Sequence, residues 1–359
     1  MPEIQTPKAK IIMTDKQIQK SGNESVNVQA NNIVFQSGLS YSDVKEIAID
    51  VYEKNFYRLS GIAADTARER AELITEKFLT TLQDKNPDGF AIAQDPDFQY
   101  ALFTVQKEYA KTGDKDIGEL LVDLLVERTK EEKRSLRQIA MNEALVIVPK
   151  LTNEQLSALT IVFTLKNTIF KINNLEKLNN YIETRIAPFV QTITDDDTYY
   201  QHIVYTGCAS ISIGSISLER IFLTNYAGMF CKGFSAEELL SVNPDANVNA
   251  ILTHCLHNGE LIQIAGLNDS AINTLALNRN ISADMLNKLL ELQHKATMND
   301  KEVRDYLEKS NPCMAALFKY WSSTPLENMT LTSVGIAIGH ANMRRITGDS
   351  SDLSIWIKT

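Results

Sequence analysis

The chain has 359 residues, and its 45 Asp and Glu residues outnumber its 36 Lys and Arg residues, which gives a formal net charge of −9. This acidity argues against nucleic acid as the main partner, because phosphate binding depends on clustered basic residues. No apolar run reaches the roughly 18 residues that a membrane-spanning helix needs, so we expect no membrane partner.

The low content of backbone-breaking residues predicts a mainly α-helical protein. Only 15 Gly and 9 Pro are present, whereas an all-β fold needs turn residues about every 8–12 positions. The first ten residues lack the apolar core of a secretory signal. The four cysteines include no CxxC pair, which is typical of reduced thiols. We therefore expect a cytoplasmic protein.

Residues 1–37 are predicted to form a polar tail and a short β-strand element. Apolar and polar residues alternate over 25–30, and Asn31-Asn32 follows as a turn, which indicates one or two short strands. Because a hairpin of this size is marginally stable alone, the strands pair either with distant C-terminal strands or with the same segment of other subunits. On the second alternative the contact residues are Val26, Val28, Ile33 and Phe35.

Residues 38–195 are predicted to form an all-helical domain. Apolar residues recur with helical spacing from Ser42 to Leu82 with only Gly61 between them, so this stretch is either one long helix or two helices bent at Ser60-Gly61. A helix of this length packs against a second long helix or a neighbouring subunit. On this reasoning Val44, Ile47 and Val51 are further candidates for an oligomer contact. Helix starts are predicted at Asp95-Pro96 and at the capping box of Thr152 and Gln155.

Residues 196–359 are predicted to form a mixed, mostly helical domain with a small β-sheet. Short β segments are predicted near 261–264, 329–331 and 353–357, and together with the helices between them they suggest a winged-helix-like module. A capping box at Ser235 and Glu238 predicts a further helix start. Other helices are predicted over 247–258, 282–295, 300–309, 313–321 and from Ser333 to Arg345, with Gly348 ending the last one.

Several segments resemble an uncharacterised family of bacterial, cytoplasmic, mostly helical proteins. They are Gly38–Ala48, Asp97–Phe103, Tyr205–Ile211, and Leu331–Gly335 with Leu353–Ile357. The likeness covers about 20–358. The family has no assigned activity, so the resemblance implies an identity and little chemistry. The element Gly22-x-x-Ser25-x-Asn27-x-Gln29-Ala30 is similar to short β motifs of bacterial proteins suspected of conflict or phage-defence roles.

The standard signatures of catalysis are mostly absent from the sequence. The phosphate-binding GxxxxGK[ST] loop, GxGxxG, HExxH and GxSxG are all missing, which argues against nucleotide hydrolysis, zinc peptidase and α/β-hydrolase chemistry. The candidate catalytic residues are His202 and Cys208, which lie near three consecutive aspartates at 195–197. A thiolate nucleophile needs a base and a group that orients the base, but a structural cysteine fits the same pattern.

Two further groups of residues are candidates for binding sites. His254-Cys255-Leu256-His257 offers imidazole and thiolate ligands, but structural zinc takes four ligands and no partner pair is present. We therefore expect no metal and no cofactor. Arg344 and Arg345, together with Lys8, Lys10, Lys16 and Lys20, are the candidates for phosphate contacts on the winged-helix-like module.

The sequence favours a non-catalytic, self-assembling scaffold or sensor of the bacterial cytoplasm, in phage defence or stress. Its partners would be further copies of itself and another protein acting as effector. The alternative hypothesis is an effector enzyme or a nucleic-acid-binding protein that uses the Cys208 region or the C-terminal module.

Overall fold

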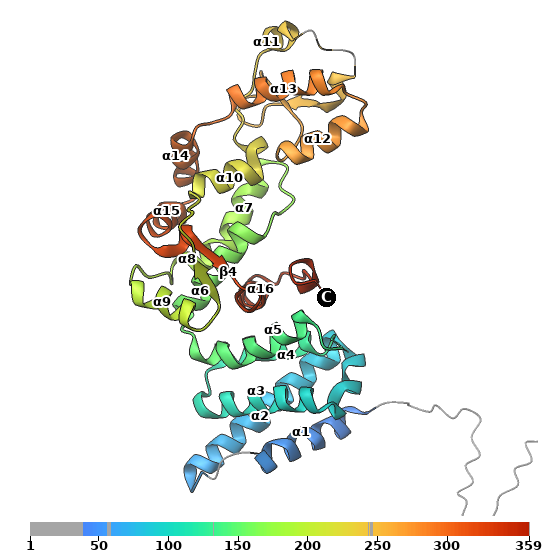
Figure 1. Ribbon diagram of the computed structural model, residues 1–359, viewed down its shortest axis with the longest axis vertical. Helices are drawn as coiled ribbons and strands as arrows, with labels where there is room; N and C mark the ends of the chain where they lie inside the picture. Colours follow the sequence, from blue (N-terminus) through green and yellow to red (C-terminus); the bar gives the residue numbers. More distant parts are fainter. Residues whose placement is uncertain (1–38, 56–58, 132, 243, 245–246, 359) are drawn as a thin grey trace, which may run out of the picture. The chain divides into compact units, whose positions relative to one another are not determined.

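The computed structural model describes residues 39–55, 59–131, 133–242, 244 and 247–358. This part of the chain is 71% helical, with 16 α-helices and only short antiparallel strands (Figure 1), which confirms the mainly α fold. The predicted strands that contain Val26, Val28, Ile33 and Phe35 lie outside the described residues. No described helix combines the length and the apolarity needed to cross a bilayer.

The long apolar stripe of 42–82 belongs to two helices, α1 (Tyr41–Asn55) and α2 (Ile62–Lys85). Gly61 precedes α2 with a φ of 58°, in the left-handed region that a continuing α-helix cannot use. The alternative of two helices is therefore confirmed. Val44 of α1 is buried in the core, where α1 packs against α2 and α3 (Pro96–Thr112).

The next helices begin where the sequence predicted them. The Asp95 side chain accepts a hydrogen bond from the backbone N–H of Phe98 and caps α3. The capping box at Thr152 opens α6 (Asn153–Val162), and the one at Ser235 opens α11 (Ala236–Ser241). The remaining helices of this half of the chain are α4 (Lys115–Arg128), α5 (Leu136–Ile147), α7 (Leu175–Arg185), α8 (Ala187–Val190), α9 (Asp197–Tyr205) and the short turns η1 (Pro87–Gln94), η2 (Val148–Lys150) and the π-helical η3 (Phe163–Asn167).

The last long helix, α16 (Ser333–Thr347), packs against helices from early in the chain, namely α4, α5 and α6. A side chain at Gly339 would place its Cβ 3.0 Å from the backbone oxygen of Leu159, so the glycine permits the close approach of α16 to α6. The larger core therefore runs from Val44 to Ile357 without a break at residue 195. The domain boundary predicted at 195–196 stays a prediction, because a shared core does not test whether either part folds on its own.

A second, smaller core is formed by residues between Phe234 and Leu289. The elements of the C-terminal half are α10 (Leu218–Tyr226), η4 (Ala227–Met229), η5 (Val248–Ile251), α12 (Asp269–Asn278), α13 (Ala283–Ala296), α14 (Asp300–Ser310), α15 (Cys313–Ser323), η6 (Pro325–Asn328) and η7 (Leu353–Ile355). The predicted helix over 247–258 is largely wrong, because its central residues leave η5 to form a strand.

Two separate two-stranded antiparallel sheets are present among the described residues. Strand β1 (Ala209–Ile211) pairs with β4 (Met329–Leu331), with Ala209 opposite Leu331, and the two lie side by side in Figure 1. Strand β2 (Leu252–His254) pairs with β3 (Ile262–Ile264). The predicted strands near 261–264 and 329–331 are thus confirmed, but they do not share a sheet.

The predicted strand over 353–357 is wrong, and so the expected three-stranded sheet of winged-helix type is not formed. The Asp352 side chain accepts a hydrogen bond from the N–H of Ser354 and starts the helical turn η7. Trp356 then packs against the rings of Phe163 and His340. This packing explains Trp356, one of the apolar residues that the sequence pattern assigned to a strand.

Candidate functional site

An uncharged exposed surface begins at the end of α9 and includes β1. We call it the β1 surface and define it by its exposed apolar side chains. No Asp, Glu, Lys or Arg stands between Asp197 and Glu219, and every residue over 210–216 is exposed. The Ile213 side chain is 104% exposed, which means that the fold itself gains nothing from burying it. The β1 surface consists of Val204, Tyr205, Ile211, Ile213 and Ile216.

Strand β1 is bonded along one edge only in the part of the chain that is described. On the β4 side, the Ser212 N–H donates to the Asn328 carbonyl at 3.0 Å, and the Thr332 N–H donates to the Cys208 carbonyl at 3.0 Å. Because successive residues of a strand present their backbone groups to opposite sides, those of Ala209 and Ile211 point away from β4. An edge of this kind without charge or proline invites pairing with another strand.

Two buried or half-buried side chains hold the residues around β1 and β4 in place. The Trp321 indole N–H donates to the Ile216 carbonyl at 2.9 Å. The Lys166 ammonium, in the π-helical turn η3, donates to the carbonyls of Leu326, Glu327 and Met329, each at 2.9 Å. Burial lowers the pKa of Lys166 to about 8, against the opposing effect of the Glu327 carboxylate.

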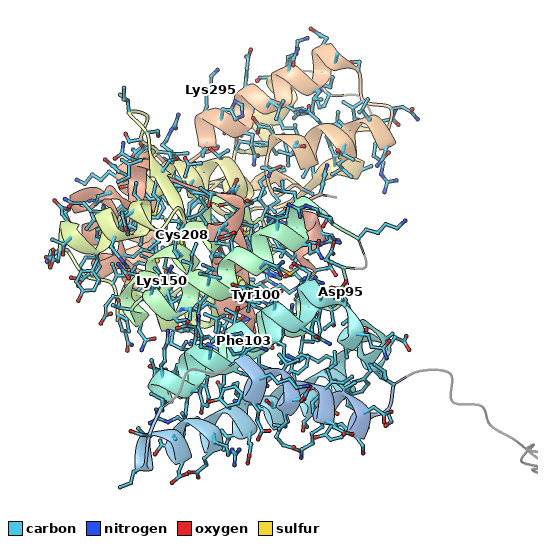
Figure 2. The ribbon with its side chains drawn as sticks, turned by 60° about the horizontal axis from the view of Figure 1, so that its bottom comes forward. Asp95, Tyr100, Phe103, Lys150, Cys208 and Lys295 are labelled. Atoms are coloured by element: carbon cyan, nitrogen blue, oxygen red, sulfur yellow. The ribbon has the colours of Figure 1, made fainter. Side chains whose placement is uncertain are left out.

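Two of the sequence motifs meet beneath this surface, namely Tyr205–Ile211 and Leu331–Gly335. The Thr332 hydroxyl lies 2.7 Å from the Gly207 carbonyl oxygen and 3.1 Å from that of Cys208. A Cβ at Gly335 would lie 2.0 Å from the same Cys208 oxygen, so only glycine lets the start of α16 approach the backbone there. Figure 2 labels Cys208 at this junction.

The candidate catalytic pair, His202 and Cys208, is not assembled. No hydrogen bond joins the two residues among the described contacts. The Cys208 thiol is buried and accepts a hydrogen bond from the Thr206 hydroxyl at 3.4 Å, and burial raises its pKa. His202 instead pairs with the Gln155 side chain at 3.0 Å, and the nearby Asp196 caps α9. A buried thiol with a raised pKa is a poor nucleophile.

The three polar residues of the His254–His257 run contact three different backbone carbonyls. His254 Nδ1 lies 3.0 Å from the Gly259 oxygen, and His257 Nε2 lies 2.7 Å from the Met229 oxygen. The Cys255 thiol donates to the Cys231 carbonyl at 3.3 Å. The described residues contain no group of three or more His, Cys, Asp or Glu side chains that could hold a metal ion.

The candidate phosphate-binding arginines are paired with carboxylates of α4. Arg344 Nη1 lies 2.7 Å from Glu127 Oε2, and Arg345 Nη1 lies 2.8 Å from Asp116 Oδ1. Both arginine side chains are largely buried, so they fix α16 to α4. A nucleic-acid phosphate would have to break these pairs before it could bind either residue.

Of the residues proposed for an oligomer contact, Val44 is buried in the chain's own core, whereas Ile47 and Val51 are half-buried on α1. The sequence reasoning did not select the isoleucines of the β1 surface. Their signal was the alternation Ser210-Ile211-Ser212-Ile213, which has the period of a half-exposed strand.

The comparisons with known proteins agree with a family assignment and add no chemistry. A protein-family model matches residues 38–357, and its description names no activity. No curated protein and no solved structure matches the chain.

Proposed function

The chain belongs to the family whose model matches residues 38–357, and because that match names no reaction, we propose a function from the geometry. The protein is a non-catalytic scaffold or sensor that assembles with further copies of itself. The observation that carries this proposal is the β1 surface, where an uncharged row of exposed isoleucines lies beside an open strand edge. A setting in bacterial phage defence or stress, with another protein as effector, is proposed from sequence resemblance alone.

The exposed side chains can contribute to a reversible contact. Burying one isoleucine completely contributes about 1.5–3 kcal/mol. The exposed fractions of Ile211, Ile213 and Ile216 are 46%, 104% and 38%, which is about two whole side chains, so together they contribute on the order of 3–6 kcal/mol. Association itself costs about 4–15 kcal/mol in lost motion. The apolar contact and the strand hydrogen bonds therefore support an equilibrium that depends on protein concentration.

The catalytic alternative has no comparable support among the described residues. Cys208 is buried beneath β1, and His202 is engaged by Gln155. Arg344 is held by Glu127. Each of these three described side chains therefore has a structural contact that explains it, whereas the candidate lysines at 8, 10, 16 and 20 lie outside the described residues.

The test is Ile213→Lys in the full chain, with molar mass measured by sedimentation velocity over a range of concentrations. Ile213 contacts little of its own fold, so the variant should fold normally and dissociate at least about tenfold more readily, because a lysine charge opposes burial. Leu277→Lys is the matched control, since Leu277 is a 76% exposed side chain on α12, outside the β1 surface.

Two results would contradict the proposal: a wild-type chain that stays monomeric at every concentration, or an Ile213→Lys variant that assembles like the control. A chain lacking residues 1–37 tests the remaining alternative, which is assembly through the N-terminal element. If only that deletion abolishes assembly, the N-terminal element holds the oligomer and the β1 surface does not.

A further inference from the structure

We propose that a cleft between the start of α7 and the β2–β3 pair binds a small amphipathic anion, that is, an apolar body with one carboxylate or phosphate group. This site goes beyond the proposed self-assembly and does not depend on it. The cleft has a volume of about 520 Å³, within the roughly 300–1,000 Å³ of small-molecule sites. Its lining comes from residues 171–177, from Met229 of η4, from residues 253–267 around β2 and β3, and from the first turn of α12.

Most of the lining side chains are apolar. Ile172 and Met229 are buried, and Leu256 and Leu267 are half-buried. All four belong to the larger core or pack against it, so the apolar surface that they present to the cleft is held in place. An apolar group that enters the cleft therefore displaces water from a preformed surface, which is favourable.

Gln263 is the buried polar side chain of the lining, and its hydrogen bonds are already made. Its Oε1 accepts from the Leu256 N–H at 3.0 Å, and its Nε2 donates to the Gly228 carbonyl at 3.0 Å. Thr253 lies opposite Gln263 across the two strands, so both side chains occupy the face of the pair that lines the cleft. No lining residue has a buried side-chain polar atom without a partner. The body of the ligand therefore needs no polar group.

The charge of the cleft is opposite in sign to that of the whole chain. Lys171 and Lys177 line the cleft and none of its lining residues is Asp or Glu, although the chain has a net charge of −9. Both lysines are exposed, and within the described part of the chain neither ammonium group has an ion-pair partner. An anion bound there meets two cations without having to break an existing pair, which is the opposite of the situation at Arg344.

These two features together decide the class of ligand. Inorganic phosphate would meet the lysines but leave the apolar lining in water, and an uncharged apolar molecule would leave the lysines without an anion. A cation would be repelled by both ammonium groups. Because a lysine acts as a point charge toward carboxylate and phosphate alike, the head group is decided by experiment.

The test is isothermal titration calorimetry of the full chain with octanoate, octyl phosphate and octanol. We expect saturable binding of at least one of the two anions, and the tighter anion identifies the head group. Octanol has the same apolar chain without the charge, so it should bind at least about tenfold more weakly.

The lysines are tested by the double variant Lys171→Gln with Lys177→Gln, which should weaken anion binding at least about tenfold and leave octanol binding unchanged. The matched control is Lys295→Gln with Lys309→Gln. It removes the same two charges at exposed positions outside the lining of the cleft, and it should bind the anion as the wild type does. The comparison separates a local contact from the effect of net charge.

The cleft itself is tested by Thr253→Trp, which should abolish binding of all three ligands because the indole fills the space. Thr253 is an exposed strand residue, a position that tolerates an aromatic side chain, and thermal unfolding confirms that the variant folds. The site would be overturned if the wild type bound neither anion, if the lysine variant bound as tightly as its control, or if Thr253→Trp kept the wild-type affinity. Each of these results would leave self-assembly, measured by sedimentation, standing.

Discussion

His340 on α16 offers the sharpest test of how the core is built. Its side chain is 1% exposed and packs against the rings of Phe163 and Trp356. Its Nε2 lies 3.1 Å from the Ser351 carbonyl oxygen, so the neutral ring donates a hydrogen bond there. Burial, and then the charge of Arg344, lower the pKa of His340 from 6.5 to about 4, against smaller opposing effects of Ser351, Glu127 and Asp349.

The sign of the pH dependence follows from these two pKa values. Between about pH 6.5 and pH 4 the unfolded chain binds a proton at His340 that the folded chain does not bind. Stability from the neutral ring is therefore complete above about pH 6.5 and is lost as the pH falls toward 4. Between pH 7 and pH 5 this single group lowers the free energy of unfolding by about 2 kcal/mol.

The assay is urea unfolding at pH 7 and pH 5, followed by circular dichroism, for the wild type and His340→Gln. Glutamine keeps an N–H donor and does not titrate, so the variant should lose about 2 kcal/mol less than the wild type over this interval. His294→Gln, at an exposed imidazole, controls for removal of a histidine and should behave as the wild type does. Equal losses for wild type and His340→Gln, within about 0.5 kcal/mol, would refute the reasoning.

Two further predictions concern the contacts at either end of α16. Gly335→Ala should lower the free energy of unfolding by about 2 kcal/mol or more, because its Cβ would meet the Cys208 carbonyl oxygen at 2.0 Å. Gly259→Ala, with nothing within 4 Å of its Cβ, is the control, and both variants are measured by urea unfolding. Equal stability of the two variants would contradict the contact between α16 and Cys208. Arg344→Ala should cost about 1–3 kcal/mol by thermal or urea unfolding, because it leaves the buried Glu127 carboxylate with Lys130 as its remaining ion-pair partner. Arg220→Ala, at an exposed side chain, should change stability by less than about 0.5 kcal/mol, and a loss as large as that of Arg344→Ala would argue against the pairing.

The local features of the fold were predictable because their signals lie within a few residues. An aspartate before a proline identified the start of α3, and Thr152 with Gln155 identified α6, since a cap involves only the first turn of its own helix. Two alternatives for 42–82 remained open in the sequence. The positive φ of Gly61 is a property of the folded backbone and decided between them.

The long-range features were not predictable from local patterns. Strand β1 pairs with β4, a strand more than a hundred residues further along the chain. The residues around Trp356 have the apolar content of a strand, but their burial against Phe163 selected a helical turn. Propensity is a weak guide when tertiary packing supplies most of the burial.

The candidate site also combines local features that the sequence could predict with long-range contacts that it could not. Alternating isoleucine and serine at 210–213 could be read as a strand, but its exposure depends on β4, which covers one edge and leaves the other open. The sequence indicated His202 as a catalytic candidate and Arg344 as a phosphate-binding candidate because of their side-chain chemistry. Their partners, Gln155 and Glu127, are distant in sequence and give each a structural contact.

Helix α16 connects the stability of the core to the presentation of the β1 surface. Thr332 at its start contacts the Gly207 and Cys208 carbonyls, whereas His340 and Arg344 anchor its later turns. In the proposed assembly, a substitution in α16 would therefore act indirectly, by displacing β1. Ile213 has no such role, because its side chain is fully exposed. An assembly defect in Ile213→Lys at unchanged stability consequently reports on the surface itself, and this distinguishes an interface residue from a residue that supports the interface.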